Sequence, residues 1–283
     1  MQRASPGGKR SPDRPSAVAV PMKQYLADLD PALLRRRMGR FWEHDFAAMS
    51  YLEVSNAISR VLTVGRRCVL PATMRTIPSG TQLFRVRHVP RELVPTEVDC
   101  WAPPADRATG NRVNGDGEPW LYTSFDLGTA FSEMPIPSGK IAMVMVYKVC
   151  EELKCSCPEF GDEDRFNLTR RERLRLGLAT QFMRDLFSLE VNDGEEHLYR
   201  ITQALVTDLV DYPECVAVWY PAVKSHGHHV AIKGPHQRRL RLSSVKMMDS
   251  VTVSDSADAK QYDIIFQLLR SYDGNLVENT RAT

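Results

Sequence analysis

Gly110-Asn-Arg112-Val-Asn114-Gly-Asp-Gly117-Glu-Pro119, followed by Trp120-Leu-Tyr122-Thr123-Ser124, is the stretch around which the rest of this 283-residue chain can be interpreted. Its first half contains three glycines, two asparagines, an aspartate and a proline, a composition typical of a turn-rich loop. Its second half is bulky and β-prone, which predicts a short strand that ends in hydroxyl-bearing side chains.

A short helix is expected directly after this strand. Asp126 can cap a helix that begins near Leu127. Ala130 and Glu133 are three residues apart and therefore share one face of that helix. A loop with an arginine, a strand that ends in hydroxyls and a helix that bears a carboxylate can converge on a single pocket.

The overall composition is that of an ordinary globular protein, with 43% hydrophobic and 25% charged residues. The net charge of +2 gives no global reason to expect binding to nucleic acid or to an anionic membrane. No apolar run reaches the length of about 18 residues that a membrane-spanning helix needs. The polar N-terminus lacks the apolar core of a signal peptide, so we expect a cytoplasmic protein. Its six cysteines should therefore be reduced thiols.

Two short clusters could suggest a metal site, but neither has a convincing spacing. Cys155-Ser-Cys157 is too close for an ordinary zinc pair and has no second pair nearby. His226-Gly-His228-His229 lies in a glycine-containing turn, where histidines are usually exposed to solvent. We therefore predict no bound metal.

The N-terminal quarter of the chain divides into a tail and a helical extension. Residues 1–20 are rich in Pro, Gly, Ser, Arg and Lys and should form a disordered tail. From Met22 to Val64 apolar residues recur at helical spacing, which predicts two or three amphipathic helices within an extension that spans residues 21–75. These helices are long enough to form an oligomer interface or a lid. Arg35-Arg36-Arg37 suits a solvated helix face better than a nucleic-acid or partner patch.

The segment from Gly80 to His88 alternates its side chains in the way a half-buried strand does, with Leu83 and Arg85 on one face. An arginine that faces inward needs a reason. Arg85 can lie in solvent at a strand edge or form a structural ion pair, or it can clamp a phosphate or carboxylate, for which the guanidinium fork is suited.

The remainder of the chain mixes strands and helices. Residues 141–149 form a continuous apolar run, typical of a central strand. We predict a loop or insertion over 153–167, amphipathic helices over 169–191 and 195–212, and strands over 216–220, 229–233 and 239–245. The C-terminal tail, residues 251–283, should contain a short helix over 261–272.

This order of elements predicts an α+β fold. A domain with a mixed sheet, residues 76–250, would carry the helical extension at its N-terminal end. The sequence contains no P-loop, dinucleotide glycine fingerprint, G-x-S-x-G elbow or H-E-x-x-H helix. The common enzyme chemistries are therefore not signalled.

Four parts of the chain, in this order, resemble the RES domain, a family named for an arginine, a glutamate and a serine. The resemblance covers about residues 80–245. The matching segments are Leu83-Phe84-Arg85-Val86, the block from Gly110 to Ser124 with Ala130 and Glu133, the helix from Tyr199 to Leu205, and Trp219-Tyr220-Pro221-Ala222-Val223 with His229-Val-Ala-Ile.

The chain departs from the family pattern at two positions. Val113 replaces a usual aromatic residue, and Ala222 stands where the serine of the family's name is expected. Ser225, three residues later, is the candidate to replace that serine.

The resemblance implies an ADP-ribosyltransferase-like fold that binds and cleaves NAD. NAD would be the substrate, and no separate cofactor is implied. Several members of the family are bacterial toxins that deplete NAD and are held by a neighbouring antitoxin, so an antitoxin protein is an expected partner. Nucleic acid and membranes are not expected partners.

The resemblance also implies roles for individual residues. Glu133 and Arg85 form the catalytic set, because a carboxylate can stabilise the positive charge that develops on the ribose when nicotinamide leaves. Arg85 and Arg112 can bind the pyrophosphate, while Tyr122 can stack on nicotinamide or orient the ribose. The other residues expected to bind NAD are Asn114, Ser124, Ala222 at the serine position, and Ser225.

Three functions follow from these patterns. The first is an NAD-consuming enzyme, a glycohydrolase or phosphorylase, in which Glu133 is essential. The second is ADP-ribosyl transfer to a macromolecule. The third is a RES-like module that has lost catalysis and acts by binding a partner, which Ala222 favours.

Overall fold

The computed structural model describes residues 22–65, 67–68, 72–134, 140–158, 168–253 and 263–273. Its α-helices are α1 (Met22–Asp28), α2 (Pro31–Trp42), α3 (Tyr51–Leu62), α4 (Glu97–Cys100), α5 (Leu127–Glu133), α6 (Arg170–Phe187) and α7 (Tyr199–Ala204). Shorter helical segments are η1 (Ala105–Arg107), η3 (Glu196–Leu198), the π-helical η4 (Leu205–Val210) and η5 (Gly234–Arg239).

The strands are β1 (Thr63–Val64), β2 (Arg67–Cys68), β3 (Thr73–Ile77), β4 (Gln82–Pro90), β5 (Trp120–Ser124), β6 (Lys140–Val149), β7 (Leu153–Cys157), β8 (Ala217–Pro221), β9 (His228–Lys233), β10 (Leu240–Val253) and β11 (Asp263–Asp273). Within the described residues, nine of them form one sheet in the order β11-β10-β6-β4-β5-β9-β8-β7-β3. β1 and β2 form a separate pair.

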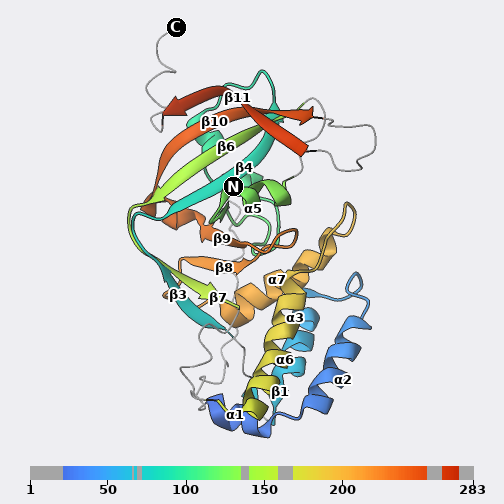
Figure 1. The fold of residues 1–283 in the computed structure, drawn as a ribbon. Coiled ribbons are helices and arrows are strands. Elements are labelled where there is room, and N and C mark those ends of the chain that lie inside the picture. Colours follow the sequence, from blue (N-terminus) through green and yellow to red (C-terminus); the bar gives the residue numbers. More distant parts are fainter. Residues whose placement is uncertain are drawn as a thin grey trace, which may run out of the picture.

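The large sheet is divided into two halves at the boundary between β4 and β5. β4 pairs with β6 along its whole length, and β5 pairs with β9 along its whole length. Between β4 and β5 the register contains a single pair, Phe84 opposite Ser124. Figure 1 shows β10, β6 and β4 in the upper half and β9, β8, β7 and β3 in the lower half. The two halves can therefore diverge where they meet.

The sheet is mixed because β7 and β8 run parallel, whereas the other pairs in the described sheet are antiparallel. Parallel neighbours need a long crossover connection, usually helical. The chain between β7 and β8 contains α6 and α7, which supply this crossover. The α+β class with a mixed sheet, predicted from the sequence, is confirmed.

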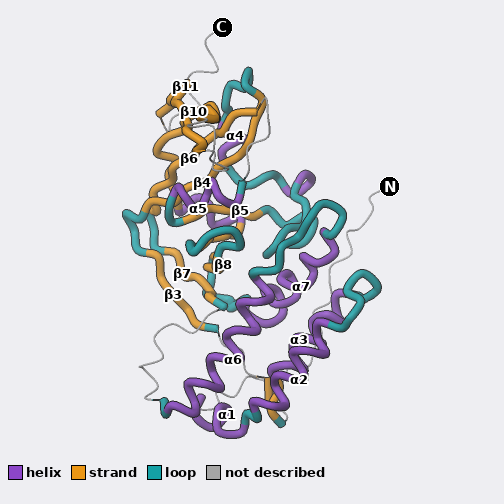
Figure 2. The backbone as a smooth tube through the Cα atoms, turned by 45° about the vertical axis from the view of Figure 1, so that its right-hand side comes forward, coloured by secondary structure: helices purple, strands orange, loops and turns teal. Residues whose placement is uncertain are grey.

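The helices α1, α2, α3, α6 and α7 pack together beside the lower half of the sheet, as Figures 1 and 2 show from two directions. Their buried residues form one core with residues of β8 and β9, among them Val218, Tyr220 and Ala231. A second core lies around Leu83, Tyr147 and Val230. A third, smaller core joins α5 to β4 and β6.

The N-terminal helices share the first of these cores. Phe41 of α2 meets Phe182 of α6 edge to face, with ring centroids 5.2 Å apart. The buried Arg175 of α6 donates to the carbonyls of Leu26 and Ala27 in α1, at 2.6 and 2.9 Å. The predicted helices between Met22 and Val64 are thus confirmed, and they pack against the helices of the main domain.

The structure corrects two predictions. The expected loop over 153–167 is wrong in its first part, because Leu153–Cys157 is the strand β7. Leu153, Cys155 and Cys157 are buried in this strand. Both cysteines are free, and a free cysteine packs as a small hydrophobic residue. The expected helix over 261–272 is also wrong: β11 pairs antiparallel with β10. A short apolar run is compatible with a helix or with a strand. Here the edge of β10 provides backbone partners, which favours the strand.

Other predictions concern residues outside the described ranges or boundaries that shift slightly. The disordered tail predicted for residues 1–20 lies outside the described residues. The helix predicted over 169–191 ends at Phe187, and Thr169 caps its start in a capping box with Glu172. The predicted strand and helix around Ser124 are confirmed as β5 and α5, and the side chain of Asp126 accepts from the Thr129 amide at 2.7 Å.

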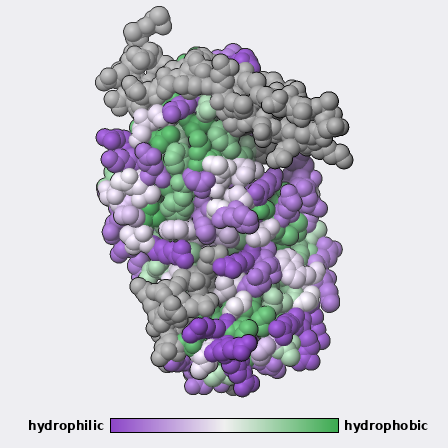
Figure 3. All heavy atoms as spheres, in the orientation of Figure 1, coloured by the Kyte–Doolittle hydropathy of each residue, from purple (hydrophilic) through white to green (hydrophobic). Residues whose placement is uncertain are grey.

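Among the helices of the described residues, none combines the length and the apolar character needed to cross a membrane. On the face drawn in Figure 3, hydrophobic and hydrophilic residues are interspersed.

We expect Phe41→Ala to lower the free energy of unfolding by about 3–5 kcal/mol, because it opens a cavity between α2 and α6. Leu52→Ala in α3 is the control, since this leucine is 66% exposed and should change stability by no more than about 0.5 kcal/mol. Urea unfolding followed by circular dichroism measures both. Equal, small losses in the two variants would show that the N-terminal helices add nothing to the common core.

Candidate active site

A cavity of about 370 Å³ lies where β4 and β5 separate. This volume is within the range of about 300–1,000 Å³ typical of small-molecule sites. Five residues predicted to bind or cleave a ligand line it together: Arg85, Arg112, Tyr122, Ser124 and Glu133. The structure therefore brings together the loop arginine, the strand end and the helix carboxylate. Further lining residues come from β8, β9 and the start of α7: Tyr220, His229 and Tyr199.

Glu133, the last residue of α5, presents its carboxylate at the cavity wall. Its Oε1 accepts from the backbone amide of Lys224 at 2.6 Å and lies 3.7 Å from Nε2 of His229. Burial opposes ionisation of this carboxyl, but the contacts to His229 and to the backbone amides of Lys224 and Val223 outweigh burial, so the pKa of Glu133 falls below its usual value. Glu133 is therefore a fixed, ionised carboxylate at neutral pH.

His229 connects this carboxylate to the strand hydroxyl. Its Nδ1 lies 2.8 Å from Oγ of Ser124, which is directly opposite it in the β5–β9 register. The tautomer in which Nδ1 accepts from Ser124 presents Nε2–H to Glu133. Ser124, His229 and Glu133 thus form a line of polar contacts across three elements.

The sequence-based expectation for His229 is wrong. Clustered histidines in a glycine-containing turn were expected to be exposed, whereas the side chain of His229 is only 13% exposed and packs beside Tyr220, with ring centroids 5.4 Å apart. One signal in the sequence could have identified it. His229 begins the apolar run Val-Ala-Ile, so it belongs to the strand and shares the strand's buried environment.

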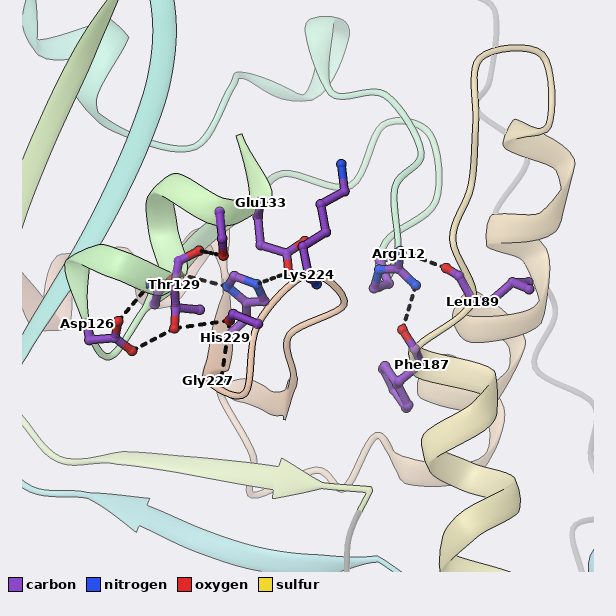
Figure 4. Close-up of polar contacts among 12 residues, drawn as sticks. Arg112, Asp126, Thr129, Glu133, Phe187, Leu189, Lys224, Gly227 and His229 are labelled. Carbon is purple, nitrogen blue, oxygen red and sulfur yellow. Dashed lines mark hydrogen bonds and ion pairs between the residues drawn. The ribbon is translucent and has the colours of Figure 1, made fainter. Parts of the chain in front are cut away.

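Arg112 is held by the C-terminal end of α6. Its Nη1 donates to the carbonyl of Phe187 at 2.7 Å, and its Nη2 donates to that of Leu189 at 3.1 Å. The guanidinium also lies over the ring of Tyr199, 5.6 Å from its centroid. Figure 4 shows Arg112 with its two carbonyl partners on one side and Glu133 with its contacts on the other. Because a guanidinium has five N–H donors, Arg112 keeps donors for a ligand.

Asn114 organises the loop that carries Arg112. Its side-chain nitrogen donates to the carbonyls of Thr109, Gly115 and Glu118, at 3.0, 2.9 and 3.0 Å. Its side-chain oxygen accepts from the hydroxyl of Tyr122. The amide of this buried side chain is therefore committed to the loop, and Asn114 acts here as a positioning residue.

Tyr122 links the same loop to the cavity. Its hydroxyl accepts from the Val113 amide at 3.2 Å and donates to Asn114. Burial raises the pKa of Tyr122 well above its usual value, so the phenol stays protonated. Val113, which replaces an aromatic residue of the family pattern, is fully buried in the helical core.

Arg85 lines the cavity, yet its guanidinium already has a partner. Nη1 donates to the carbonyl of Trp101 at 2.8 Å, and the guanidinium lies near the buried hydroxyl of Tyr147. Burial lowers the pKa of Arg85, and the tyrosine hydroxyl partly offsets that effect. Of the alternatives that the sequence left open for Arg85, the described part of the structure shows neither an arginine in solvent nor an ion pair but a bond to a backbone carbonyl, and its role as an anion clamp stays a prediction.

Ala222 and Ser225 belong to the loop between β8 and β9, and neither lines the cavity. Ala222 is buried, and its amide donates to the carbonyl of Gly227 at 2.9 Å. The hydroxyl of Ser225 donates to Oγ1 of Thr129 at 3.3 Å and accepts from the Gly227 amide at 3.2 Å. In this geometry the loop supports α5, and the binding roles of both residues stay predictions.

The same loop approaches α5 very closely at Gly227. A Cβ atom on this glycine would lie 1.8 Å from Oγ1 of Thr129, which is itself bound to the carboxylate of Asp126 at 2.7 Å. Only a glycine allows this approach. This contact determines how closely the loop lies against α5. The backbone amide of Lys224, in the same loop, donates to Glu133 (Figure 4).

A second cavity, of about 550 Å³, adjoins the first. The two share Arg112, Glu133, Tyr199 and Val223. The remaining lining residues of the second cavity are Glu190, Val191, Asn192, Asp193 and Lys224. Glu133 and Arg112 can therefore be reached from two sides. Within the described residues, no three His, Cys, Asp or Glu side chains gather in a way that could hold a metal ion.

Comparison with known proteins adds little to this geometry. No family model matches the chain, and no curated protein sequence matches it. A solved structure similar to it is a chain of the M. tuberculosis MbcT–MbcA toxin–antitoxin complex, with 12% sequence identity and a TM-score of 0.34. The alignment covers 79% of this chain and 91% of that chain.

We expect His229→Ala to raise the pKa of the Glu133 carboxyl, because the imidazole is one of the contacts that lower it. Protonation of Glu133 would then occur at a higher pH than in the wild type. A carbon NMR titration of glutamate-labelled protein measures this shift. His44→Ala, at an exposed position after α2, is the control and should leave the titration unchanged. An unchanged or lower pKa in His229→Ala would contradict the proposed contact.

We expect Gly227→Ala to destabilise the protein by about 1–3 kcal/mol, because the new methyl group overlaps Thr129. Gly177→Ala in α6 is the matched control, since its Cβ would meet nothing within 4 Å and alanine favours a helix. The double substitution Gly227→Ala with Thr129→Ala should recover part of the loss. Thermal unfolding measures these three variants and the single variant Thr129→Ala, and strictly additive losses in the double variant would exclude the overlap as the cause.

Proposed function

We propose that this cavity cleaves the bond between nicotinamide and ribose in NAD, with Glu133 as the catalytic carboxylate. The observation that supports the proposal most directly is the position of this ionised, half-buried carboxylate at a cavity wall, with the guanidinium of Arg112 lining the same cavity. NAD needs both charges, since its pyrophosphate is anionic and its ribose becomes cationic during the reaction.

The chemistry requires no redox partner. As the C–N bond breaks, its electron pair moves to the pyridinium nitrogen, and neutral nicotinamide leaves. The ribose carbon then carries positive charge, which a carboxylate beneath the ring stabilises. Water adds its oxygen to that carbon and releases a proton, giving ADP-ribose. Phosphate as the nucleophile gives the corresponding ribosyl phosphate.

The neighbouring residues have distinct parts in this proposal. His229 and the Lys224 amide keep Glu133 ionised and oriented. The free donors of Arg112 bind the pyrophosphate, and Tyr122 offers a ring edge to the nicotinamide or the ribose. Ser124 positions His229 and does not need to touch the substrate.

Two other functions have an observation in their favour. The adjoining cavity reaches Glu133 from a second side, which would suit transfer of ADP-ribose to a side chain of a macromolecule. Ala222, in the place of the family's serine, favours a RES-like module without catalysis that acts by binding a partner. In a toxin-type protein that partner would be an antitoxin.

Incubation of the purified protein with NAD, with and without phosphate, tests the proposal by the release of free nicotinamide. We expect Glu133→Gln to reduce turnover by about 100- to 1,000-fold, as is typical when a group that stabilises transition-state charge is removed. Glu43→Gln, at the exposed end of α2, removes the same charge elsewhere and should retain full activity.

The outcomes separate the three functions. Intact NAD with the wild type, or undiminished turnover in Glu133→Gln, would contradict the proposal. Label from NAD that appears on protein or nucleic acid, in place of free ADP-ribose, would indicate the transferase. Turnover that is absent in the wild type and gained in Ala222→Ser would indicate the binding module.

A further inference from the structure

A further groove lies along α6, far from the two cavities of the candidate active site, and it has a marked concentration of arginines. It has a volume of about 850 Å³ and lies between the start of α2 and the first half of α6. Among the described residues, its lining includes five arginines and no acid: Arg35, Arg170, Arg171, Arg173 and Arg175. The whole chain has a net charge of only +2, so this groove is a local excess of positive charge.

These positive charges are not explained by the stability of α6. Arg170, Arg171 and Arg173 lie in the first turns of the helix, where the helix dipole disfavours cations. Within the described part of the chain, Arg35, Arg170 and Arg171 form no ion pair with a carboxylate. Glu172, the acid nearest in sequence, is committed to the Thr169 cap at 2.7 Å.

One arginine of the groove is buried and only partly satisfied. Arg175 is 9% exposed, and Nη1 donates to two carbonyls of α1. Its Nε is buried and has no hydrogen-bond partner within the described residues. A buried donor without a partner is costly, and Nε of Arg175 is left unsatisfied while Nη1 joins α6 to α1.

The floor of the groove is apolar. Within the described part of the chain, Leu174 is 65% exposed and lies beside the arginines that line the groove. Leu178 and Pro31 line the groove beside it. Gly177 lies on the same helix, and a Cβ there would meet nothing within 4 Å, so the groove is open above it. In Figure 3, hydrophobic atoms lie among strongly hydrophilic ones near the lower end of the molecule, where α6 begins in Figure 1.

This combination distinguishes between two kinds of anionic partner. Single-stranded nucleic acid is usually held by aromatic side chains that stack on its bases, and none of the described residues that line the groove is aromatic. An acidic amphipathic helix has leucine-like side chains on one face and carboxylates beside them, which would match the apolar floor and the surrounding guanidiniums.

We propose that the groove between α2 and α6 is a docking site for an acidic amphipathic helix of a partner protein. The apolar face of the partner covers Leu174 and Leu178, and its carboxylates pair with Arg35, Arg170 and Arg171. This site does not depend on NAD chemistry, so it stands or falls separately from the proposed activity.

Two substitutions test the groove without touching the candidate active site. Gly177→Glu places a negative side chain in the open space of the groove and replaces the glycine by a better helix former, so the fold should be retained. Gly39→Glu is the matched control: it makes the same change at an exposed glycine of α2 that does not line the groove and whose Cβ also meets nothing within 4 Å. Arg171→Glu reverses one of the exposed charges.

The probe is a fluorescein-labelled helical peptide with leucines at i, i+3, i+4 and i+7 and glutamates flanking them. Fluorescence anisotropy measures its binding to the full chain, together with that of a lysine-for-glutamate peptide and a single-stranded oligonucleotide. Of these three probes, we expect only the acidic peptide to bind, and we expect added salt to weaken its binding. Gly177→Glu and Arg171→Glu should each raise the Kd of the acidic peptide by about tenfold or more, while Gly39→Glu leaves this Kd unchanged.

Several results would overturn the proposal. Binding of the oligonucleotide but not the acidic peptide would assign the groove to nucleic acid. Peptide binding that Gly177→Glu leaves intact would place the peptide elsewhere. Residues Asp162, Glu163 and Asp164 lie outside the described residues but precede α6 in the sequence. Binding that appears only when these three acids are replaced by their amides would assign the groove to the chain's own segment.

Discussion

The candidate active site depends on the single register pair between β4 and β5, Phe84 opposite Ser124, at which the two halves of the sheet meet. A longer ladder between β4 and β5 would close the space in which the cavity lies. Without this pair, β4 with Arg85 and β5 with Tyr122 would no longer be neighbours in one sheet, and the cavity that both strands line would lose its shape. Because β4 and β5 pair only at Phe84 and Ser124, the two strands are neighbours at this point and separate beyond it. The polar line from Ser124 through His229 to Glu133 begins at this junction.

Backbone atoms orient two of the side chains near this junction, those of Glu133 and Arg112. Lys224 holds Glu133 through its amide, and Arg112 is oriented by two carbonyls after α6. Side chains supported in this way lose little freedom when a ligand binds, since their rotamers are already fixed. Tyr122 is oriented by a side chain as well, since its hydroxyl donates to the side-chain oxygen of Asn114. Backbone groups thus orient Glu133 and Arg112, while side-chain contacts orient Tyr122 and His229.

Local features of the sequence predicted the centre of the site well. The cap at Asp126 and the β-prone run before Ser124 act over a few residues, so β5 and α5 could be inferred. His229 was predicted to begin a strand, but its contacts with Ser124 and Glu133 could not be inferred, because they depend on a register between strands over a hundred residues apart. The same holds for the contact of Gly227 with Thr129. The strand β11 was missed because an apolar run suits a helix or a strand until its neighbour is known.

The helix α6 connects the two regions of interest. Its first turns carry the arginines of the groove, and the carbonyls at its far end hold Arg112. Its 18 residues form a rod of about 27 Å, at 1.5 Å per residue. Because one helix serves both regions, a change in the position of α6 would displace the Phe187 carbonyl that orients Arg112 together with the arginines of the groove.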